Sequence, residues 1–152
     1  MIKSVLIVGS GEIANKHKQA LKLISKKIQV IRITNRKLAF YLRKNKKKLK
    51  FDFIIVCSPS SEHFNNINLM EKYFKKIKIL IEKPLFNEIK KINYRFKNYY
   101  YVGYNLRFHP IIQFLKKYLN NKKIFSINIS CSSYLPNWRK NKDYRKSVSA
   151  QK

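Results

Sequence analysis

The stretch that decides the fold runs from residue 5 to residue 14 and reads VLIVGSGEIA. Its first four residues form an apolar run, typical of a strand buried on both faces of a parallel sheet. Gly9 ends that run, and a helical pattern begins directly after Gly11. A buried strand that turns through glycines into a helix predicts the opening unit of an α/β domain.

Working outward from this stretch, strand and helix signals alternate. Apolar runs predict further strands at residues 28–33, 51–57, 78–82 and 99–103. Helical spacing predicts helices after Gly11 and at residues 38–44, 61–74, 87–96 and 110–119. This order predicts βαβ units, and therefore an α/β fold with a Rossmann-like parallel sheet and helices on both faces.

The pattern changes at residues 124–132, where Phe125, Ile127, Ile129 and Cys131 alternate with polar residues. Strict alternation predicts a half-buried strand of antiparallel character. We therefore divide the chain into a dinucleotide-binding domain at 1–123 and the start of a second, incomplete α+β domain at 124–152. A strand without a sheet to join could drive self-association through its apolar edge.

Length and composition narrow the class of protein. The chain has 152 residues, of which 45% are hydrophobic, so one domain with a sizeable core is expected. It has no apolar run near the roughly 18 residues of a membrane helix, so we expect no membrane association. The two cysteines, Cys57 and Cys131, make no disulfide framework, which favours a cytoplasmic location.

The formal net charge of +28 suggests polyanions as partners. However, Lys outnumbers Arg by 28 to 7, whereas nucleic-acid recognition favours the planar Arg fork. Lys, Ile, Asn, Tyr and Phe, whose codons can be built from A and T alone, make up 83 of the 152 residues. An AT-rich genome and a solvated surface therefore explain the charge, which argues against a nucleic acid partner. The densest basic run, at 43–50, keeps a polyanion site open as the alternative.

The first candidate site is the hexapeptide GSGEIA, which fits the pattern G-x-G-x-x-A between a strand and a helix. Here Gly9 permits a tight turn, Gly11 lets the backbone approach a pyrophosphate, and Ala14 allows close packing of helix and strand. The free N–H groups of the helix N-terminus can bind phosphate. The predicted cofactor-binding residues of this turn are Gly9, Ser10, Gly11, Glu12, Ile13 and Ala14.

The end of the second strand bears on which dinucleotide is bound. An acidic residue usually holds the ribose hydroxyls there, but the chain has no Asp or Glu between Glu12 and Asp52. Instead Thr34 and Arg36 follow the strand, and an Arg at this place can hold a 2′-phosphate. This favours NADP over NAD. Alternatively, Arg36 is one more surface cation.

A third motif, Glu82-Lys83-Pro84, follows the fourth strand. Ligands of open α/β sheets bind beyond the carboxyl ends of the strands. A lysine there could reach a substrate hydroxyl or carbonyl, and burial or nearby cations can adapt it to acid–base work. Lys83 is therefore the candidate catalytic residue.

Four pieces, taken together and in order, resemble one known family: VLIVGSGEIANKH at 5–17, CSPSSEH at 57–63, EKP at 82–84 and GYNLRFHP at 103–110. It is the glucose-fructose/inositol oxidoreductase family, often called Gfo/Idh/MocA. The stretch YLPNWRKNKDYRKSVSA, at 134–150, is similar to the branch that acts on nucleotide-linked or sialic-acid-type sugars.

The resemblance implies a nicotinamide dinucleotide cofactor, a sugar substrate and roles for particular residues. Lys83 matches the lysine that contacts the substrate and helps proton transfer, and the Lys83–Pro84 bond is cis in relatives. From the residues alone, the other matched positions could equally be a helix-face histidine, surface charges and a turn residue. The residues implied beside the ribose and nicotinamide, or facing the cleft, are Ser58, Pro59, His63, Glu82, Asn105 and Arg107.

The sequence also departs from the family. Members continue into a second domain, whose Gly-rich segment is followed by an Asp and a His that complete the catalytic set. None of His17, His63 and His109 follows such a segment. Three hypotheses result: an NAD(P)-dependent sugar oxidoreductase reduced mainly to its nucleotide-binding half, a non-catalytic dinucleotide-binding remnant of a broken gene, or a basic nucleic-acid-binding protein on a Rossmann scaffold. None of them requires a metal site.

Overall fold

A computed structural model describes residues 2–91 and 95–132, together with Tyr134, Asn137, Asp143 and Arg145. The chain divides into two compact units, Met1–His109 and Pro110–Lys152. The first unit holds the sheet and every predicted site residue, and it is described first. The boundary at 123/124 that the sequence suggests remains a prediction.

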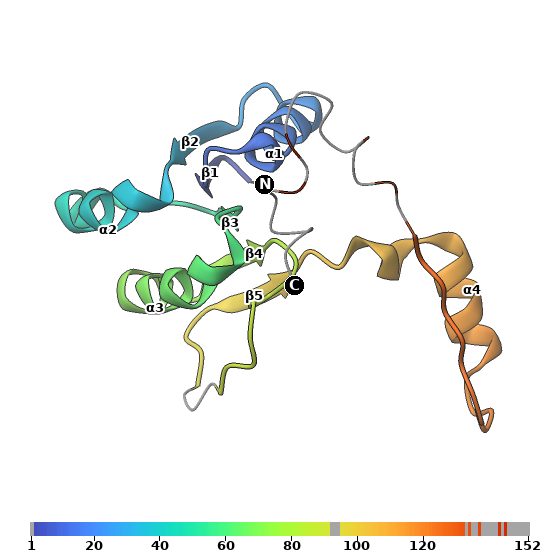
Figure 1. The fold of residues 1–152 in the computed structure, drawn as a ribbon. Coiled ribbons are helices and arrows are strands. Elements are labelled where there is room, and N and C mark those ends of the chain that lie inside the picture. The colour runs from blue at the N-terminus through green and yellow to red at the C-terminus, as the bar shows by residue number, and fades with distance from the viewer. Residues whose placement is uncertain are drawn as a thin grey trace. The chain divides into compact units, whose positions relative to one another are not determined.

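The first unit is built on a five-stranded parallel sheet, which confirms the predicted α/β, Rossmann-like class (Figure 1). The strand order is β2-β1-β3-β4-β5, and every neighbouring pair is parallel. The strands are β1 (Ser4–Val8), β2 (Gln29–Ile33), β3 (Phe53–Val56), β4 (Lys78–Ile81) and β5 (Tyr99–Val102). The helices of this unit are α1 (Glu12–Ile24), α2 (Asn35–Lys44) and α3 (His63–Tyr73), with 3-10 turns η1 (Lys46–Lys48), η2 (Ser60–Glu62) and η3 (Asn105–Phe108).

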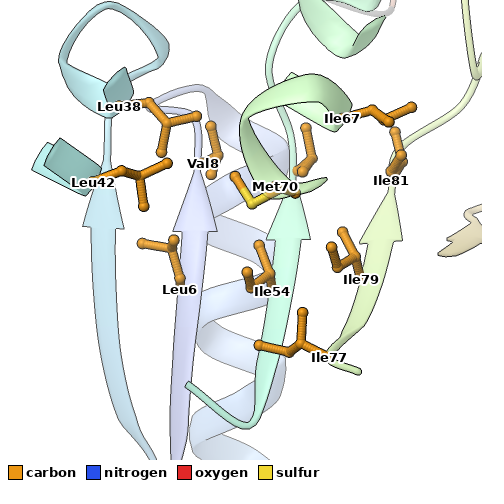
Figure 2. Close-up of a cluster of buried hydrophobic side chains, with 11 residues drawn as sticks. Leu6, Val8, Leu38, Leu42, Ile54, Ile67, Met70, Ile77, Ile79 and Ile81 are labelled. Carbon is orange, nitrogen blue, oxygen red and sulfur yellow. The ribbon is translucent and has the colours of Figure 1, made fainter. Parts of the chain in front are cut away.

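Helices cover both faces because successive strand residues point to opposite sides. On one face, Leu6, Val8 and Ile54 pack under side chains from α2 and α3. Figure 2 shows this cluster, in which Leu38 and Leu42 come from α2 and Ile67 and Met70 from α3. On the other face, Val5, Ile7 and Ile55 form a second cluster with Ala14 and Leu21 of α1.

The amino edge of the sheet, where each strand begins, is held by two carboxylates. Asp52 Oδ2 accepts hydrogen bonds from the backbone N–H groups of Lys3 and Ser4, at 2.7 and 2.9 Å. Glu71 of α3 accepts from the Lys97 N–H, the Asn98 amide and the Tyr100 hydroxyl, at 2.7–2.8 Å. These bonds fasten the segment before β5 to the C-terminal end of α3.

Asn98 makes the largest number of hydrogen bonds in the contact between α3 and the segment before β5. Its buried side chain accepts from the Ile77 N–H and donates to the carbonyls of Met70 and Phe74. One amide thus joins the residue before β4 to carbonyls at the C-terminal end of α3, where the helix leaves backbone oxygens without a full set of partners.

The predicted helix at 87–96 is wrong. Its residues 87–91, 95 and 96 are not helical, and 92–94 lie outside the described residues. Leu85 and Phe86 pack on the core, but Ile89 is 98% exposed, and Glu88 pairs with Lys90 instead. Isolated helices of this length are marginal in water, and with Ile89 left exposed no burial stabilises a helix here.

In the second unit, α4 (Pro110–Tyr118) confirms the predicted helix at 110–119. The predicted strand at 124–132 is wrong: these residues have no strand structure, and Phe125 and Ile129 are more than 80% exposed. A strand needs a partner for its backbone groups, and none of the strands in the described residues pairs with this segment. The family-like stretch at 134–150 lies almost entirely outside the described residues.

Candidate dinucleotide site at the carboxyl edge

The candidate site lies along the carboxyl edge of the sheet, where four strands end at one level. The N–H groups of Gly9, Cys57, Glu82 and Gly103 donate to carbonyls of the neighbouring strands, at 2.7–2.9 Å. The chain crosses from β1 to β2 on one side, and β3 lies on the other side of β1. This reversal between β1 and β3 is the place where open α/β sheets bind ligands.

The two glycines of the turn after β1 differ in what a larger side chain would meet there. Gly9 has φ +135°, and a Cβ added there would lie 2.7 Å from the Cys57 carbonyl oxygen, so no other residue fits. Gly11 is the N-cap of α1, and a Cβ added there would meet no atom within 4 Å. The backbone at Gly11 therefore borders open space, which fits a group approaching the helix N-terminus.

The other residues of the hexapeptide differ in how far they are buried against the sheet. Ala14 is completely buried against the sheet, in agreement with the close packing expected of it. Ser10 is exposed, Ile13 is 41% exposed, and Glu12 pairs with Lys16 one turn later, at 2.9 Å. The first turn of α1 thus buries only Ala14 and leaves its other side chains accessible.

The end of β2 carries the residues predicted to select the cofactor. Thr34 is the N-cap of α2 without a side-chain cap bond, and both Thr34 and Arg36 are exposed. Between them, the Asn35 Oδ1 atom is buried and has no hydrogen-bond partner in the described part of the chain. Sequence reasoning missed Asn35, and its side chain could not be placed without the structure.

The turn after β3 is fixed from α3. His63 is only 1% exposed, and its Nε2 lies 2.9 Å from the Ser58 carbonyl oxygen. Its Nδ1 lies 3.1 and 2.9 Å from the carbonyl oxygens of Pro84 and Leu85. The imidazole therefore joins the turn after β3 to the loop after β4, with both ring nitrogens engaged by backbone oxygens.

Ser58 is held as firmly as the histidine. Its hydroxyl accepts a hydrogen bond from the Asn66 amide at 2.7 Å, and both side chains are buried. Pro59 follows with an extended backbone and precedes η2. Asn66 is a supporting residue that the sequence did not reveal, because its partner lies eight residues earlier in a turn.

Glu82 lies inside the edge rather than on the surface. Its Oε1 is 2.6 Å from Nε2 of His17 on α1, and its Oε2 lies beside Gly103. Burial first, and the Glu82 carboxylate second, raise the pKa of the Cys57 thiol to about 12. His17 is the second supporting residue missed from the sequence, because its partner lies 65 residues later in the chain.

The remaining predicted residues surround this cluster. The Lys83–Pro84 bond is cis, as the resemblance implies, and Lys83 is exposed, with no side-chain partner among the described residues. Asn105 and Arg107 lie on η3 beyond β5, where the Arg107 Nε donates to the Tyr104 carbonyl at 3.2 Å. Sheet topology thus brings all predicted positions to one edge, although direct side-chain contacts join only some of them.

The described residues contain neither a metal site nor a membrane-spanning helix. No group of three or more His, Cys, Asp and Glu side chains there could hold a metal ion. No helix in that part of the chain has both the length and the apolar character needed to cross a membrane.

Comparison with known proteins supports the fold. No family model and no curated protein matches the chain. Among solved structures, the chain is similar to the WlbA dehydrogenase from Chromobacterium violaceum, crystallised in complex with NADH and UDP-GlcNAcA. The TM-score is 0.54 at 18% identity, covering 78% of this chain and 40% of WlbA. The chain therefore spans about two fifths of that dehydrogenase, and a likeness at this identity establishes a shared fold.

Proposed function

We propose that the chain binds a nicotinamide dinucleotide and forms the nucleotide-binding part of an NAD(P)-dependent sugar oxidoreductase of the Gfo/Idh/MocA type. The observation that carries the proposal is the turn from Gly9 to Gly11. It lies at the reversal point of a parallel sheet, opens a helix, and leaves free space where a pyrophosphate would approach.

Each end of the dinucleotide would meet residues at this edge. Gly9–Ala14 would bind the pyrophosphate through backbone N–H groups and the positive end of the helix dipole. Thr34 and Arg36 would hold the adenosine ribose and its 2′-phosphate. Beyond β3, β4 and β5, the residues expected near the nicotinamide and its ribose are Ser58, Pro59, Glu82, Asn105 and Arg107.

His63 would support the proposed cofactor site indirectly, as a buried structural residue. Because it is buried with both ring nitrogens on backbone oxygens, we assign it to holding the Ser58 turn against the Pro84 loop. It would thereby place the segments that border the nicotinamide. This role replaces a direct contact with the cofactor, for which the imidazole has no free nitrogen.

Lys83 would act on the sugar. The bound nicotinamide supplies or accepts a hydride, while a proton must be moved at the sugar oxygen. The exposed Lys83 side chain lies just beyond β4 and is unpaired among the described residues. Its ammonium could donate that proton when the sugar carbonyl is reduced, and its neutral amine could accept it in the reverse direction. The structural likeness to WlbA, crystallised with a nucleotide-linked sugar, supports this substrate class.

The preference for NADPH over NADH is part of the proposal. It is supported by the exposed Arg36 and by the lack of an acidic residue between Glu12 and Asp52. WlbA was crystallised with NADH, which supports a nicotinamide dinucleotide without distinguishing the two. Sugar turnover would in addition need groups that orient the sugar, and none is identified in the described residues.

The test is a fluorescence titration of the purified chain with NADH and NADPH. Saturable binding to the wild-type chain, lost at least a hundred-fold in Gly11→Val, is the expected result. Since nothing lies within 4 Å of the added Cβ, the variant should unfold at the wild-type temperature. Equal affinity of the folded variant, or no binding by the wild type, would contradict the proposal.

A further inference from the structure

Lysines are concentrated in one set of turns of the first unit. The three connections from helix to strand, at residues 25–28, 45–52 and 74–77, contain eight lysines. The three connections from strand to helix, at residues 9–11, 34 and 57–62, contain none. In a parallel sheet all helix-to-strand connections lie at the amino edge, so the fold gathers these charges opposite the candidate dinucleotide site.

These lysines are exposed, and none has a side-chain partner in the part of the chain that the structure describes. All eight side chains are accessible, and no ion pair or hydrogen bond of their ammonium groups occurs within the described residues. The two acidic residues of this edge, Asp52 and Glu71, are already engaged by backbone and side-chain donors. The eight are Lys26, Lys27, Lys46, Lys47, Lys48, Lys50, Lys75 and Lys76.

The charges form a line along the edge. In the strand order β2-β1-β3-β4-β5, the lysines precede β2, β3 and β4, while Lys3 precedes β1 and Lys97 precedes β5. Every strand is thus entered through at least one exposed lysine. Five strands about 4.8 Å apart give a row of about 19 Å. Phosphates of one duplex strand recur about every 3.4 Å along the axis, so such a row spans roughly six of them.

Two simpler explanations do not account for this placement. Codon bias acts without regard to the edge of a sheet, so it predicts no difference between the two kinds of turn. Attraction to helix C-termini fits Lys22, which lies in the last turn of α1 and donates its ammonium to the Lys26 and Ile28 carbonyls of the turn that follows. The eight turn lysines make no such bond in the part of the chain that the structure describes.

Lys76 adds an independent observation. It follows α3 with φ +59°, a left-handed conformation that favours Gly or Asn over Lys. Asn is encoded by codons as AT-rich as those of Lys, so codon bias does not prefer Lys over Asn there. A lysine in this unfavourable conformation is expected where its positive charge contributes to binding.

We propose that the amino edge of the sheet binds the phosphate backbone of a nucleic acid, independently of the dinucleotide site. Flexible ammonium groups hold phosphates as point charges and read no base sequence, so binding should be non-specific and sensitive to salt. A line of charge fits a linear backbone better than the plane of a membrane. The apolar residues of the three turns pack against the core, with Ile28 and Ile77 buried, so they are not available to enter a bilayer. This proposal reverses the expectation from composition alone.

The experiment measures fluorescence anisotropy of a 20-base-pair DNA duplex and a 20-nucleotide RNA strand between 50 and 200 mM salt. About five phosphate contacts predict that the logarithm of duplex affinity falls with the logarithm of salt with a slope of about −4.5. The triple variant Lys46→Gln, Lys47→Gln, Lys48→Gln removes charge from the entrance to one strand, β3. It should flatten that slope by about one unit and weaken duplex binding about ten-fold at 50 mM salt. The relative strength of the two probes indicates whether DNA or RNA is the better ligand.

The matched control removes the same charge from the second unit, through Lys116→Gln, Lys117→Gln and Lys123→Gln. It should weaken binding less than three-fold, and both triple variants should keep the wild-type melting temperature. The edge variant should also retain NADH affinity within two-fold, which separates this proposal from the dinucleotide site. Equal losses in the two triples, no nucleic acid binding at 50 mM salt, or preferred binding to vesicles containing phosphatidylserine would overturn the proposal.

Discussion

The two edges of the same sheet differ in how their polar groups are used. At the amino edge, Asp52, Glu71 and Asn98 make hydrogen bonds that fasten strands and helices to one another. At the carboxyl edge, Gly11 borders open space, and Lys83 and Arg36 are exposed without side-chain partners in the described part of the chain. The hydrogen-bonded acids and amide of the amino edge therefore serve stability, whereas the exposed lysines of that edge and the open groups of the carboxyl edge remain available for ligands.

The carboxyl edge also has hydrogen bonds that stabilise its turns, but they are made by buried or partly buried side chains and not by the exposed Lys83 and Arg36. His63, Asn66 and the pair of His17 with Glu82 are buried or partly buried and hold the turns that carry the exposed residues. Variants of the hydrogen-bonded amino-edge residues Asp52, Glu71 and Asn98 should therefore lower the free energy of unfolding without changing dinucleotide affinity. Variants of exposed carboxyl-edge residues should do the reverse.

The largest effect is expected in the reactivity of the two cysteines. Burial and Glu82 raise the pKa of Cys57 from its ordinary 9.0 to about 12, so about a thousand-fold less thiolate is present at pH 8. Cys131 is exposed. Iodoacetamide labelling followed by mass spectrometry should modify Cys131 at least a hundred-fold faster than Cys57. Glu82→Gln should accelerate labelling of Cys57 alone; similar rates for both wild-type thiols would contradict the described burial.

The next largest effect concerns the free energy of unfolding. Asn98→Ala removes the partner of the Ile77 N–H and of carbonyls at the end of α3, which should cost about 3 kcal/mol. Urea unfolding followed by circular dichroism measures this loss, and NADH affinity should stay within two-fold. The control Asn65→Ala, at an exposed position of α3, should change stability by less than about 0.5 kcal/mol. A change in NADH affinity in folded Asn98→Ala would show that the edges are not independent.

A smaller effect is expected in cofactor preference. A charge-assisted contact from Arg36 to the 2′-phosphate should favour NADPH over NADH by about ten- to a hundred-fold. Arg36→Ala should abolish that ratio while leaving NADH affinity unchanged, as measured by parallel fluorescence titrations. Arg32→Ala, which removes a neighbouring cation bound to Asn15, is the matched control. Tighter binding of NADH than NADPH by the wild type would refute the assignment of Thr34 and Arg36.

The smallest effect concerns pH. Burial raises the pKa of Glu71, but hydrogen bonds from Lys97, Tyr100 and Asn98 outweigh it, so the pKa lies below its ordinary 4.5. The stabilisation is complete above that unfolded value and is lost as the pH falls through the folded pKa. Urea unfolding between pH 7 and pH 3 should show stability falling at the acidic end, and Glu71→Gln should reduce that fall by about 1 kcal/mol. Glu62→Gln, at a partly exposed position, should leave it unchanged.

Local patterns predicted most of the architecture. Apolar runs such as residues 5–8 and 78–82 identified strands because a parallel sheet buries both faces of each strand. Their alternation with helices placed the glycine turn, Ser58, Lys83 and Asn105 at one edge, because parallel strands all end there. The resemblance added the cis bond at Lys83–Pro84, which residue patterns alone do not reveal.

The failures have physical causes in contacts distant along the chain. The segment at 124–132 alternates like a strand but pairs with no described strand. In the segment at 87–96, Ile89 is not buried against the core, so nothing stabilises a short helix there. The contact between His17 and Glu82 joins residues 65 apart, so no local pattern indicates it. The lysines looked scattered in the sequence because their common edge exists only after the helix-to-strand turns are stacked.

The most direct test of the central claim compares Gly9→Ala with Gly11→Val for both unfolding and NADH binding. At Gly9 an added Cβ would lie 2.7 Å from the Cys57 carbonyl, so Gly9→Ala should be several kcal/mol less stable. At Gly11 the added side chain enters open space, so Gly11→Val should keep wild-type stability and lose NADH affinity at least a hundred-fold. A Gly11→Val variant that binds NADH as the wild type does would contradict a dinucleotide site at the carboxyl edge.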